Sequence, residues 1–141
     1  MDKVKLYKTE IKKNNKGNVI KYLERSKHLS KISEVYFSEI HKNKIKAWKK
    51  NITSEQFLFV YEGRIKLVIF DDRNPKKDQI SEYYIGKSSK YSRIFLPKNV
   101  WYGFQGLNKK NVIINSIKIP HSKCKFFAKN LKDKIIPNLW K

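Results

Sequence analysis

The sequence predicts an all-β protein, a sandwich or barrel of about nine short strands. Segments rich in Val, Ile, Phe and Tyr recur along the 141 residues, and turn residues separate them about every eight to twelve positions. A hydrophobic fraction of 40% with 13% aromatic residues is enough to form a packed core and argues against disorder. Helical periodicity is clear only near the C-terminus. These three observations favour an antiparallel β architecture.

The most apolar stretch, Glu55 to Arg73, is typical of a buried β-hairpin. Its first arm, Phe57 to Tyr61, is entirely apolar or aromatic, and its second, Ile65 to Phe70, is nearly so. Gly63 lies between the arms and can adopt the positive φ of a tight reversal. A hairpin this apolar is not stable alone in water, so we expect other strands to cover both faces.

The remaining elements follow from alternation and from turn residues. Pro97 and Pro120 end two of the strands, because proline lacks the N–H that a ladder needs. One C-terminal segment, Cys124 to Asp133, has the spacing of a short helix in which Phe126, Phe127 and Leu131 can share one face. The other strands are expected at Val4–Ile11, Asn18–Leu23, Ile32–Ile40, Ile45–Asn51, Ile80–Ile85, Ser92–Leu96, Val100–Phe104 and Val112–Ile119, with a loop or helical turn at Glu24–Lys31.

The formal charge of +21 suggests an anionic partner. Only four of the 33 basic residues are arginine, the residue that nucleic-acid sites use for bidentate contacts. The lysines are also spread along the chain, which is typical of a solvated surface. The scarcity of arginine and the even spread of lysines therefore argue against a nucleic-acid partner. An anionic small molecule, such as a phosphate ester, accounts for the positive charge equally well.

The chain also lacks the marks of export. No apolar run reaches the roughly 20 residues that span a bilayer, and the N-terminal segment MDKVKLYKTEIKK has no apolar signal region. A single cysteine, Cys124, cannot form an internal disulfide. We therefore expect one cytoplasmic domain over residues 1–141 without a membrane partner.

Three segments in order bring a family resemblance into view: Lys46–Lys49, Gly63–Arg73 and Leu96–Phe104. Their order and spacing resemble the dTDP-4-dehydrorhamnose 3,5-epimerase (RmlC-like) group of the cupin superfamily. The resemblance runs from about Val4 to Trp140. It implies a double-stranded β-helix, the cupin jelly-roll barrel, which agrees with the strand pattern. Further matching positions are Gly17–Val19, Glu34–Ser38, Asn115, Pro120–His121 and Pro137–Trp140.

Many cupins bind a metal, and the resemblance allows each ligand position to be checked here. Counting back from the motif glycine, Gly63, gives Gln56, Asn51 and Lys49, and the second motif gives Tyr102. Amide, ammonium and phenol groups are weak or cationic donors for a transition metal. We therefore expect no metal and no other cofactor, as in the epimerase branch.

The epimerase resemblance implies chemistry beside a ketone of a nucleotide-linked sugar, where a base removes a proton and an acid returns one. The family's base position holds Lys49, or Asn51 if the register shifts by two. The acid position aligns approximately with His121, and the family's second histidine is replaced by Tyr102. We expect Lys49, Tyr102 and His121 to be the catalytic candidates. Lys49 can act as a base if Lys46 lowers its pKa, or its ammonium can stabilise the enolate oxygen.

Substrate contacts are expected from aromatic and polar side chains near the same motifs. The alternative is structural: the aromatic residues fill the barrel, Lys49 is a solvated lysine, and His121 is a loop histidine. His28 and His41 lie in polar turns, and Arg73 follows two acids and suits a structural ion pair. The binding candidates are Lys46 and Arg64 for the diphosphate, Trp48, Trp101, Tyr102 and Phe104 for an aromatic wall, and Asn51 and Gln56 at the would-be ligand positions.

These inferences lead to one main function and one alternative. The main prediction is a metal-independent epimerase or isomerase acting on a nucleoside-diphosphate 4-keto-deoxysugar, in cell-surface polysaccharide biosynthesis. The alternative is a non-catalytic cupin that binds a nucleotide-sugar or glycan. Because barrels of the resembled family look dimeric and an exposed sheet edge favours pairing, we expect a homodimer.

Overall fold

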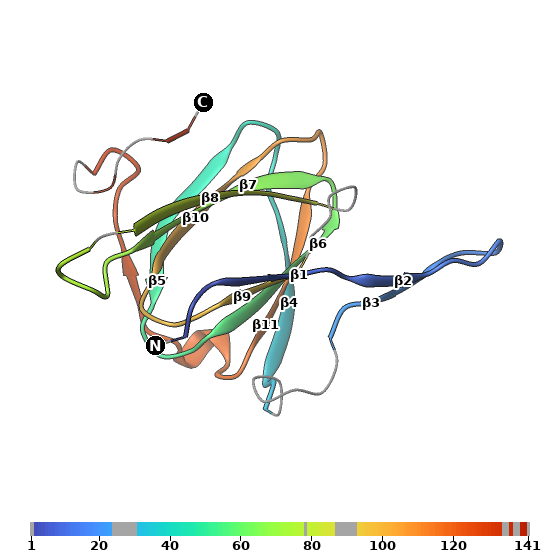
Figure 1. Ribbon diagram of the computed structural model, residues 1–141, viewed down its shortest axis with the longest axis horizontal. Helices are drawn as coiled ribbons and strands as arrows, with labels where there is room; N and C mark the ends of the chain where they lie inside the picture. Colours follow the sequence, from blue (N-terminus) through green and yellow to red (C-terminus); the bar gives the residue numbers. More distant parts are fainter. Residues whose placement is uncertain are drawn as a thin grey trace.

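Two five-stranded antiparallel sheets face each other and form a jelly-roll barrel (Figure 1). The computed structural model describes residues 2–23, 31–77, 79–86, 93–133, 136 and 139–140. Its elements are β1 (Lys5–Tyr7), β2 (Glu10–Lys12), β3 (Val19–Lys21), β4 (Glu34–Glu39), β5 (Ile45–Asn51), β6 (Gln56–Glu62), β7 (Arg64–Asp71), β8 (Gln79–Gly86), β9 (Arg93–Leu96), β10 (Trp101–Gly106), β11 (Val112–Ile117), the 3₁₀ turn η1 (His121–Lys123) and β12 (Phe126–Ala128).

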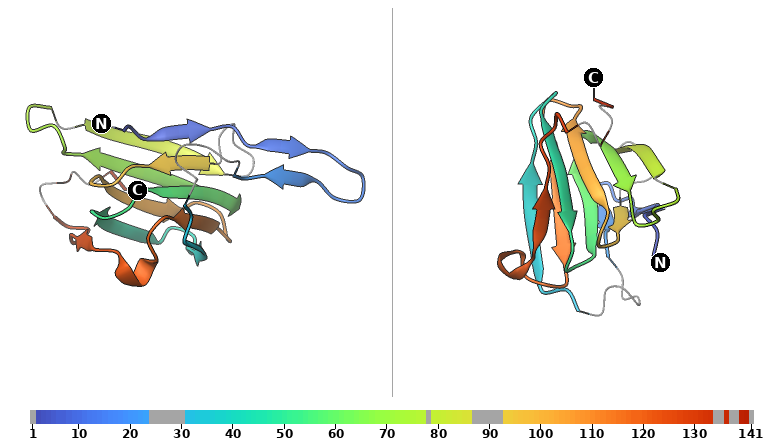
Figure 2. Two further views of the ribbon diagram at one scale, coloured as in Figure 1. Left: turned by 90° about the horizontal axis from the view of Figure 1, so that it is seen from below. Right: turned by 90° about the vertical axis from the view of Figure 1, so that its left-hand side faces the viewer.

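The first sheet has the strand order β1-β9-β6-β11-β4, and the second has the order β12-β5-β10-β7-β8 (Figure 2). The strands of the described residues pair antiparallel throughout the two sheets. The all-β jelly-roll prediction is confirmed. The described residues contain no helix long and apolar enough to span a membrane.

The expected hairpin at Glu55 to Arg73 is a corner between the two sheets. Both arms are strands, as predicted, but β6 pairs with β11 and β9, whereas β7 pairs with β10 and β8. Gly63 adopts the expected positive φ of 78°. The hairpin prediction is wrong because the two apolar arms face each other across the core and do not share a ladder.

Asn111 holds this corner in place from the loop between β10 and β11. Its side-chain oxygen accepts a hydrogen bond from the Arg64 backbone N–H at 2.9 Å, and its amide nitrogen donates to the Ile40 carbonyl at 3.0 Å. A Cβ atom at Gly63 would lie 2.1 Å from the Lys110 carbonyl oxygen. The corner therefore has room only for glycine.

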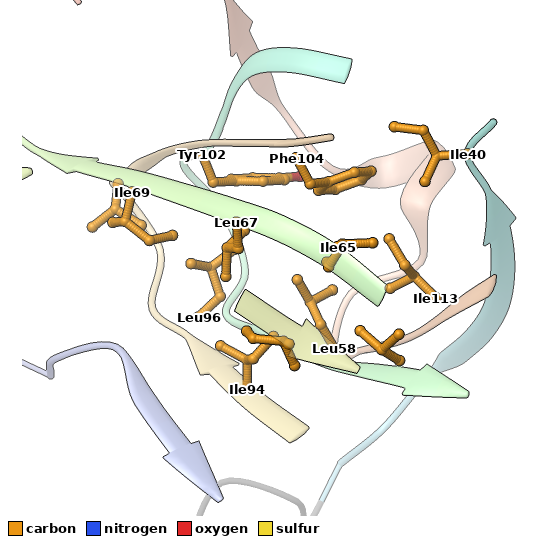
Figure 3. Close-up of a cluster of buried hydrophobic side chains, with 13 residues drawn as sticks. Ile40, Leu58, Ile65, Leu67, Ile69, Ile94, Leu96, Tyr102, Phe104 and Ile113 are labelled. Carbon is orange, nitrogen blue, oxygen red and sulfur yellow. The ribbon is translucent and has the colours of Figure 1, made fainter. Parts of the chain in front are cut away.

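Inward-facing aliphatic side chains of both sheets form the main core (Figure 3). Leu58 and Val60 of β6 meet Ile65 and Leu67 of β7, and all four are completely buried. The aromatic rings of Tyr102 and Phe104 lie over one end of this core, with centroids 6.5 Å apart. The apolar arms recognised in the sequence thus supply five of the thirteen buried residues of this core.

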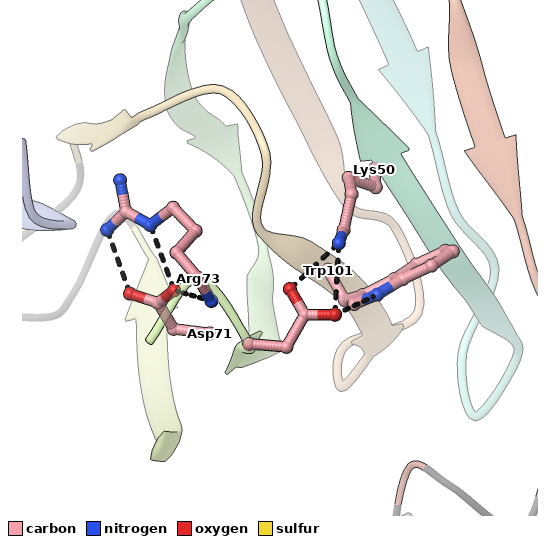
Figure 4. Close-up of polar contacts among 5 residues, drawn as sticks. Lys50, Asp71, Arg73 and Trp101 are labelled. Carbon is pink, nitrogen blue, oxygen red and sulfur yellow. Dashed lines mark hydrogen bonds and ion pairs between the residues drawn. The ribbon is translucent and has the colours of Figure 1, made fainter. Parts of the chain in front are cut away.

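A second hydrophobic cluster, the outer cluster, covers the outer face of β5, β10 and β7. It consists of Trp48, Val68, Phe70, Trp101 and Ile136, with Ala47, Leu139 and Trp140 packed against it. Beside it, Asp72 accepts hydrogen bonds from the Lys50 ammonium at 2.8 Å and from the Trp101 indole at 3.1 Å (Figure 4).

Figure 4 also shows Arg73 paired with Asp71, the structural ion pair that the sequence predicts. The Arg73 guanidinium donates to both Asp71 oxygens, at 2.9 and 2.8 Å, and this interaction lowers the pKa of the Asp71 carboxyl.

The predicted C-terminal helix is wrong. Residues Cys124 to Asp133 contain strand β12, which pairs with β5 at the edge of the second sheet. Phe127 is 55% exposed, so the aromatic residues do not form one buried helical face. The open edge of β5 offers backbone partners that outweigh a weak helical period. His28 lies outside the described residues. The expected turn at Glu24–Lys31 also lies outside them, except for Lys31.

Strands β2 and β3 pair with each other and with no other strand of the described residues, and they form an arm that projects from the barrel (Figures 1 and 2). Tyr22 fixes the base of this arm. Its ring stacks on Phe59 with centroids 4.7 Å apart, and its hydroxyl donates to the Phe57 carbonyl at 3.1 Å. The expected strand at Val4 to Ile11 is therefore split between the barrel and the arm.

We expect Gly63→Ala to lower the free energy of unfolding by about 2 kcal/mol or more, because it adds a left-handed strain and a backbone collision. Gly17→Ala is the matched control. Gly17 also has a positive φ, but nothing lies within 4 Å of its Cβ position. Urea unfolding of both variants measures the difference, and equal losses would contradict the assigned collision.

Candidate functional site

A cavity of about 410 Å³ lies between the two sheets. The first sheet contributes side chains from β4 and β11, the second from β5 and β10, and η1 adds one residue. The lining residues are Tyr36, Ser38, Ile45, Lys46, Ala47, Lys49, Tyr102, Phe104, Asn115 and His121.

The cavity brings together all three predicted catalytic candidates, Lys49, Tyr102 and His121. Two predicted binding residues, Lys46 and Phe104, line it as well. The pairing of β5 with β10 explains this convergence, since Lys49 lies opposite Tyr102 and Lys46 lies opposite Phe104. Residues more than 50 positions apart in the sequence thereby meet in one site.

Gly103 allows β5 to approach β10 closely. The register of the two strands shifts between Tyr102 and Phe104. A Cβ atom on Gly103 would lie 2.5 Å from the Cβ atom of Ala47, which lines the cavity. A larger residue here would push β5 and its lysines away from the aromatic rings of β10.

His121 opens η1 directly after Pro120. Its backbone N–H donates to a Glu34 carboxylate oxygen at 2.6 Å. Its ring lies edge-on to Tyr36, with centroids 5.5 Å apart, and against Phe126 at 5.2 Å. The imidazole is thus held between aromatic rings at the cavity wall.

Burial raises the pKa of the Tyr36 phenol to about 12, and nearby groups that ionise negatively, such as Glu34, add to the effect. Burial also raises the pKa of Tyr102, against an opposing hydrogen bond from Gln56. Both phenols therefore keep their protons at neutral pH and can donate hydrogen bonds to a ligand.

Gln56 lies behind Tyr102, inside the barrel. Its amide nitrogen is 3.4 Å from the Tyr102 hydroxyl, and its amide oxygen has no hydrogen-bond partner within the described part of the chain. Gln56 is 1% exposed and does not line the cavity. The structure therefore places it as a support for Tyr102.

Two lysines make the cavity basic. The Lys46 ammonium donates to the Glu39 carbonyl at 2.7 Å, and the Lys49 ammonium lies 5.8 Å from the centroid of the Phe126 ring. Among the lining residues that the structure describes, none is a carboxylate. Such a cavity suits a ligand that is anionic or carries an electron-rich carbonyl oxygen.

Besides Gln56, four predicted binding residues lie outside the cavity lining. Trp48 and Trp101 belong to the outer cluster on the other side of β5 and β10, and Trp48 is 1% exposed. The Arg64 guanidinium lies 5.6 Å from the centroid of the Tyr84 ring, away from the cavity. Asn51 is buried, and its side-chain oxygen accepts hydrogen bonds from the backbone of Thr53 and Ser54. The expectation of an aromatic wall that includes both tryptophans is therefore corrected.

Sequence reasoning gave no site role to three polar lining residues, Tyr36, Ser38 and Asn115. The signal was present in β4, where Tyr36 and Ser38 share one face while Val35 and Phe37 share the other. Asn115 is a polar residue within the apolar strand β11. Polar residues on the inner face of an apolar strand point to a ligand cavity.

The described residues contain no group of three or more His, Cys, Asp or Glu side chains that could hold a metal ion. The four positions that the metal pattern assigns in this sequence are Lys49, Asn51, Gln56 and Tyr102. This set lacks a carboxylate, a thiolate and an imidazole, the donors that such metals prefer.

Solved structures of sugar-nucleotide enzymes share this fold. A dTDP-sugar isomerase from Desulfovibrio desulfuricans G20 superposes with a TM-score of 0.87 at 26% identity, covering 95% of this chain and 88% of that one. The dTDP-6-deoxy-D-glucose-3,5-epimerase RmlC from Legionella pneumophila, solved with dTDP-4-keto-L-rhamnose, gives 0.79 at 15% identity, covering 94% and 76%. The TDP-quinovose 3,4-ketoisomerase WlaRB from Campylobacter jejuni gives 0.74 at 15% identity, covering 92% and 95%.

No protein-family model matches the chain, and no curated protein sequence matches it. The similarity to the RmlC-like epimerases and isomerases, first indicated by short motifs, is therefore carried by the three-dimensional structure.

The raised pKa of Tyr36 predicts a loss of stability at alkaline pH. Its pKa is 10.0 when unperturbed and about 12 in the fold, so the unfolded chain loses this proton first. The stabilising difference is present below pH 10 and is lost as the pH rises from 10 to 12. Urea unfolding across this range should show a smaller decline for Tyr36→Phe than for the wild type.

Tyr84→Phe is the matched control for that titration, because Tyr84 is 49% exposed. It should decline as the wild type does. An identical decline for Tyr36→Phe and the wild type would refute the assigned shift.

Proposed function

We propose that this protein is an isomerase that moves a proton beside the ketone of a nucleoside-diphosphate 4-keto-6-deoxysugar. The observation that supports this best is the meeting of Lys49, Tyr102 and His121 in one basic cavity. The fold that carries the cavity is shared with dTDP-sugar epimerases and ketoisomerases. Sugars of this kind are used in cell-surface polysaccharide biosynthesis, and we place the reaction in the cytoplasm.

In this proposal the reaction passes through an enolate. The His121 imidazole, open to the cavity, removes the acidic proton on the carbon beside the ketone. The Tyr102 phenol, which keeps its proton at neutral pH, returns a proton to the reacting carbon from the opposite side. The negative charge that develops on the ketone oxygen is stabilised by a lysine ammonium.

The ligand's parts match the chemistry of the walls. Lys46 is exposed at the cavity and is suited to the diphosphate. Phe104 and Tyr36 present ring faces to the apolar side of the sugar. Ser38 and Asn115 can exchange hydrogen bonds with its hydroxyl groups.

A second function remains a distinct candidate, because both positions of the family's proton path carry substitutions. Lys49 replaces the base and His121 replaces the acid. A protein with this cavity can bind a nucleotide-sugar without turning it over, and that would be the function of a non-catalytic cupin.

Deuterium incorporation separates the two functions. On incubation with TDP-4-keto-6-deoxyglucose in deuterated water, mass spectrometry should show deuterium at a carbon beside the ketone. His121→Ala should slow this exchange by about 100-fold or more, the usual contribution of a general acid or base. His41→Ala, which changes an exposed turn histidine, is the matched control and should keep the wild-type rate.

Calorimetry with the same sugar nucleotide completes the experiment. Binding without any deuterium incorporation would refute the isomerase and support the non-catalytic binder. Absence of binding would refute both.

We further propose that the protein is a homodimer. The β2–β3 arm projects from the barrel, and an isolated two-stranded ribbon is only marginally stable in water. Near its base, Val35 and Phe37 on the outer face of β4 are 53% and 65% exposed. A second copy can cover both features through a two-fold interface.

Light scattering after size-exclusion chromatography tests the dimer. The wild type should have twice the 16.9 kDa mass of one chain, and Phe37→Glu should reduce that mass to one chain by placing a charge in the interface. Phe127→Glu is the matched control, since Phe127 is also exposed but lies on β12. A wild-type mass of one chain would rule the dimer out.

A further inference from the structure

We propose that Lys49 reacts covalently with the ketone of the bound sugar and forms an imine. The observation behind this is a primary amine in a cavity whose described lining contains no carboxylate. The inference rests on the proposed function, because it requires a keto sugar in the cavity. It assigns Lys49 a role different from a simple base or a stabilising ammonium.

A lysine is a poor substitute for a base that removes a proton from carbon. Primary amines are mostly protonated at neutral pH, and an ammonium has no lone pair to accept a proton. Imine formation needs the neutral amine for the attack on the carbonyl carbon and not for the later removal of the C–H proton. The imine then takes up a proton, and its positive charge beside the reacting carbon makes the C–H bond more acidic, so a weaker base such as His121 suffices.

Lys49 is an exposed residue of β5 whose side chain lines the cavity, so its amine is accessible to a ligand there. Its ammonium has an aromatic neighbour, the Phe126 ring at 5.8 Å, and no ion pair with the carboxylates of the described residues. Lys46, three residues earlier on β5, brings a second positive charge to the same cavity. The Lys49 nitrogen is therefore not held by a described carboxylate and can reach the carbonyl carbon of a ligand in the cavity.

Lys49 is also placed beside the groups that the imine pathway needs. It lies directly opposite Tyr102 in the β5–β10 pairing. Its aromatic neighbour Phe126 contacts the ring of His121, with centroids 5.2 Å apart. An acid for the oxygen and a base for the carbon therefore line the same cavity as the amine.

Each step balances without an external reagent. The Lys49 nitrogen forms a bond to the carbonyl carbon, the carbonyl electron pair moves to oxygen, and protons from Tyr102 and the amine convert that oxygen into water, which leaves. His121 removes the proton on the adjacent carbon, and the C–H electron pair forms an enamine while the nitrogen loses its positive charge. A proton returns to carbon, water adds to the iminium carbon, and the C–N bond breaks to release the ketone and the free amine.

Reductive trapping tests the covalent step on the wild-type protein. Sodium cyanoborohydride reduces an iminium ion in preference to a ketone, so treatment with TDP-4-keto-6-deoxyglucose should join protein and probe. Mass spectrometry should show one adduct per chain, equal to the probe less one oxygen atom, on the peptide that contains Lys49. Lys49→Arg should give none, and Lys44→Arg, in the exposed turn before β5, should give the wild-type yield.

A second measurement uses water labelled with oxygen-18. Each cycle of imine formation and hydrolysis places a solvent oxygen on the ketone, so the wild type should label the probe faster than Lys49→Arg does. Lys49→Arg should also lower the rate of deuterium exchange by about 100-fold or more, although arginine keeps the positive charge.

The outcomes separate this inference from the function on which it rests. Deuterium exchange without an adduct and without faster oxygen labelling would overturn the imine and leave the isomerase standing. An adduct without deuterium exchange would support the imine and overturn the isomerase. Absence of adduct, labelling and exchange would overturn both.

Discussion

The close pairing of β5 with β10 is the contact on which the site depends. One face of this strand pair supplies Lys49 and Tyr102 to the cavity, and the other supplies Trp48 and Trp101 to the outer cluster. Gly103 allows the approach because it has no Cβ. The chemistry of the cavity and the packing behind it are therefore consequences of a single local geometry.

Most of the fold could be predicted from residue type and alternation. The segment Ile45–Asn51 is a strand over the predicted range, and the two apolar arms around Gly63 are both strands. Their partners could not be predicted, since a glycine reversal fits a hairpin and a corner between sheets equally well. The segment Cys124–Asp133 was misassigned because a short aromatic run has no period of its own, and the free edge of β5 decides its conformation.

The site was partly predictable, through the family resemblance. It identified Lys49, Tyr102 and His121, which meet although β5, β10 and η1 are separate in sequence. It also suggested Trp48 and Trp101, which point away from the cavity. Which face of β5 a residue occupies depends on the irregular register near Gly103, and no residue pattern reveals that irregularity.

The outer cluster gives this protein a built-in optical reporter. The chain has three tryptophans, and Trp48, Trp101 and Trp140 all lie in or against that cluster. Trp101 is flanked by the ammonium groups of Lys50 and Lys129, 4.9 and 5.3 Å from its ring centroid. Tryptophan fluorescence therefore arises from the back of β5 and β10, separated from the cavity by one layer of strands. A ligand in the cavity does not contact these tryptophans directly. A change in their emission when ligand is added would therefore report a displacement of the strands between them.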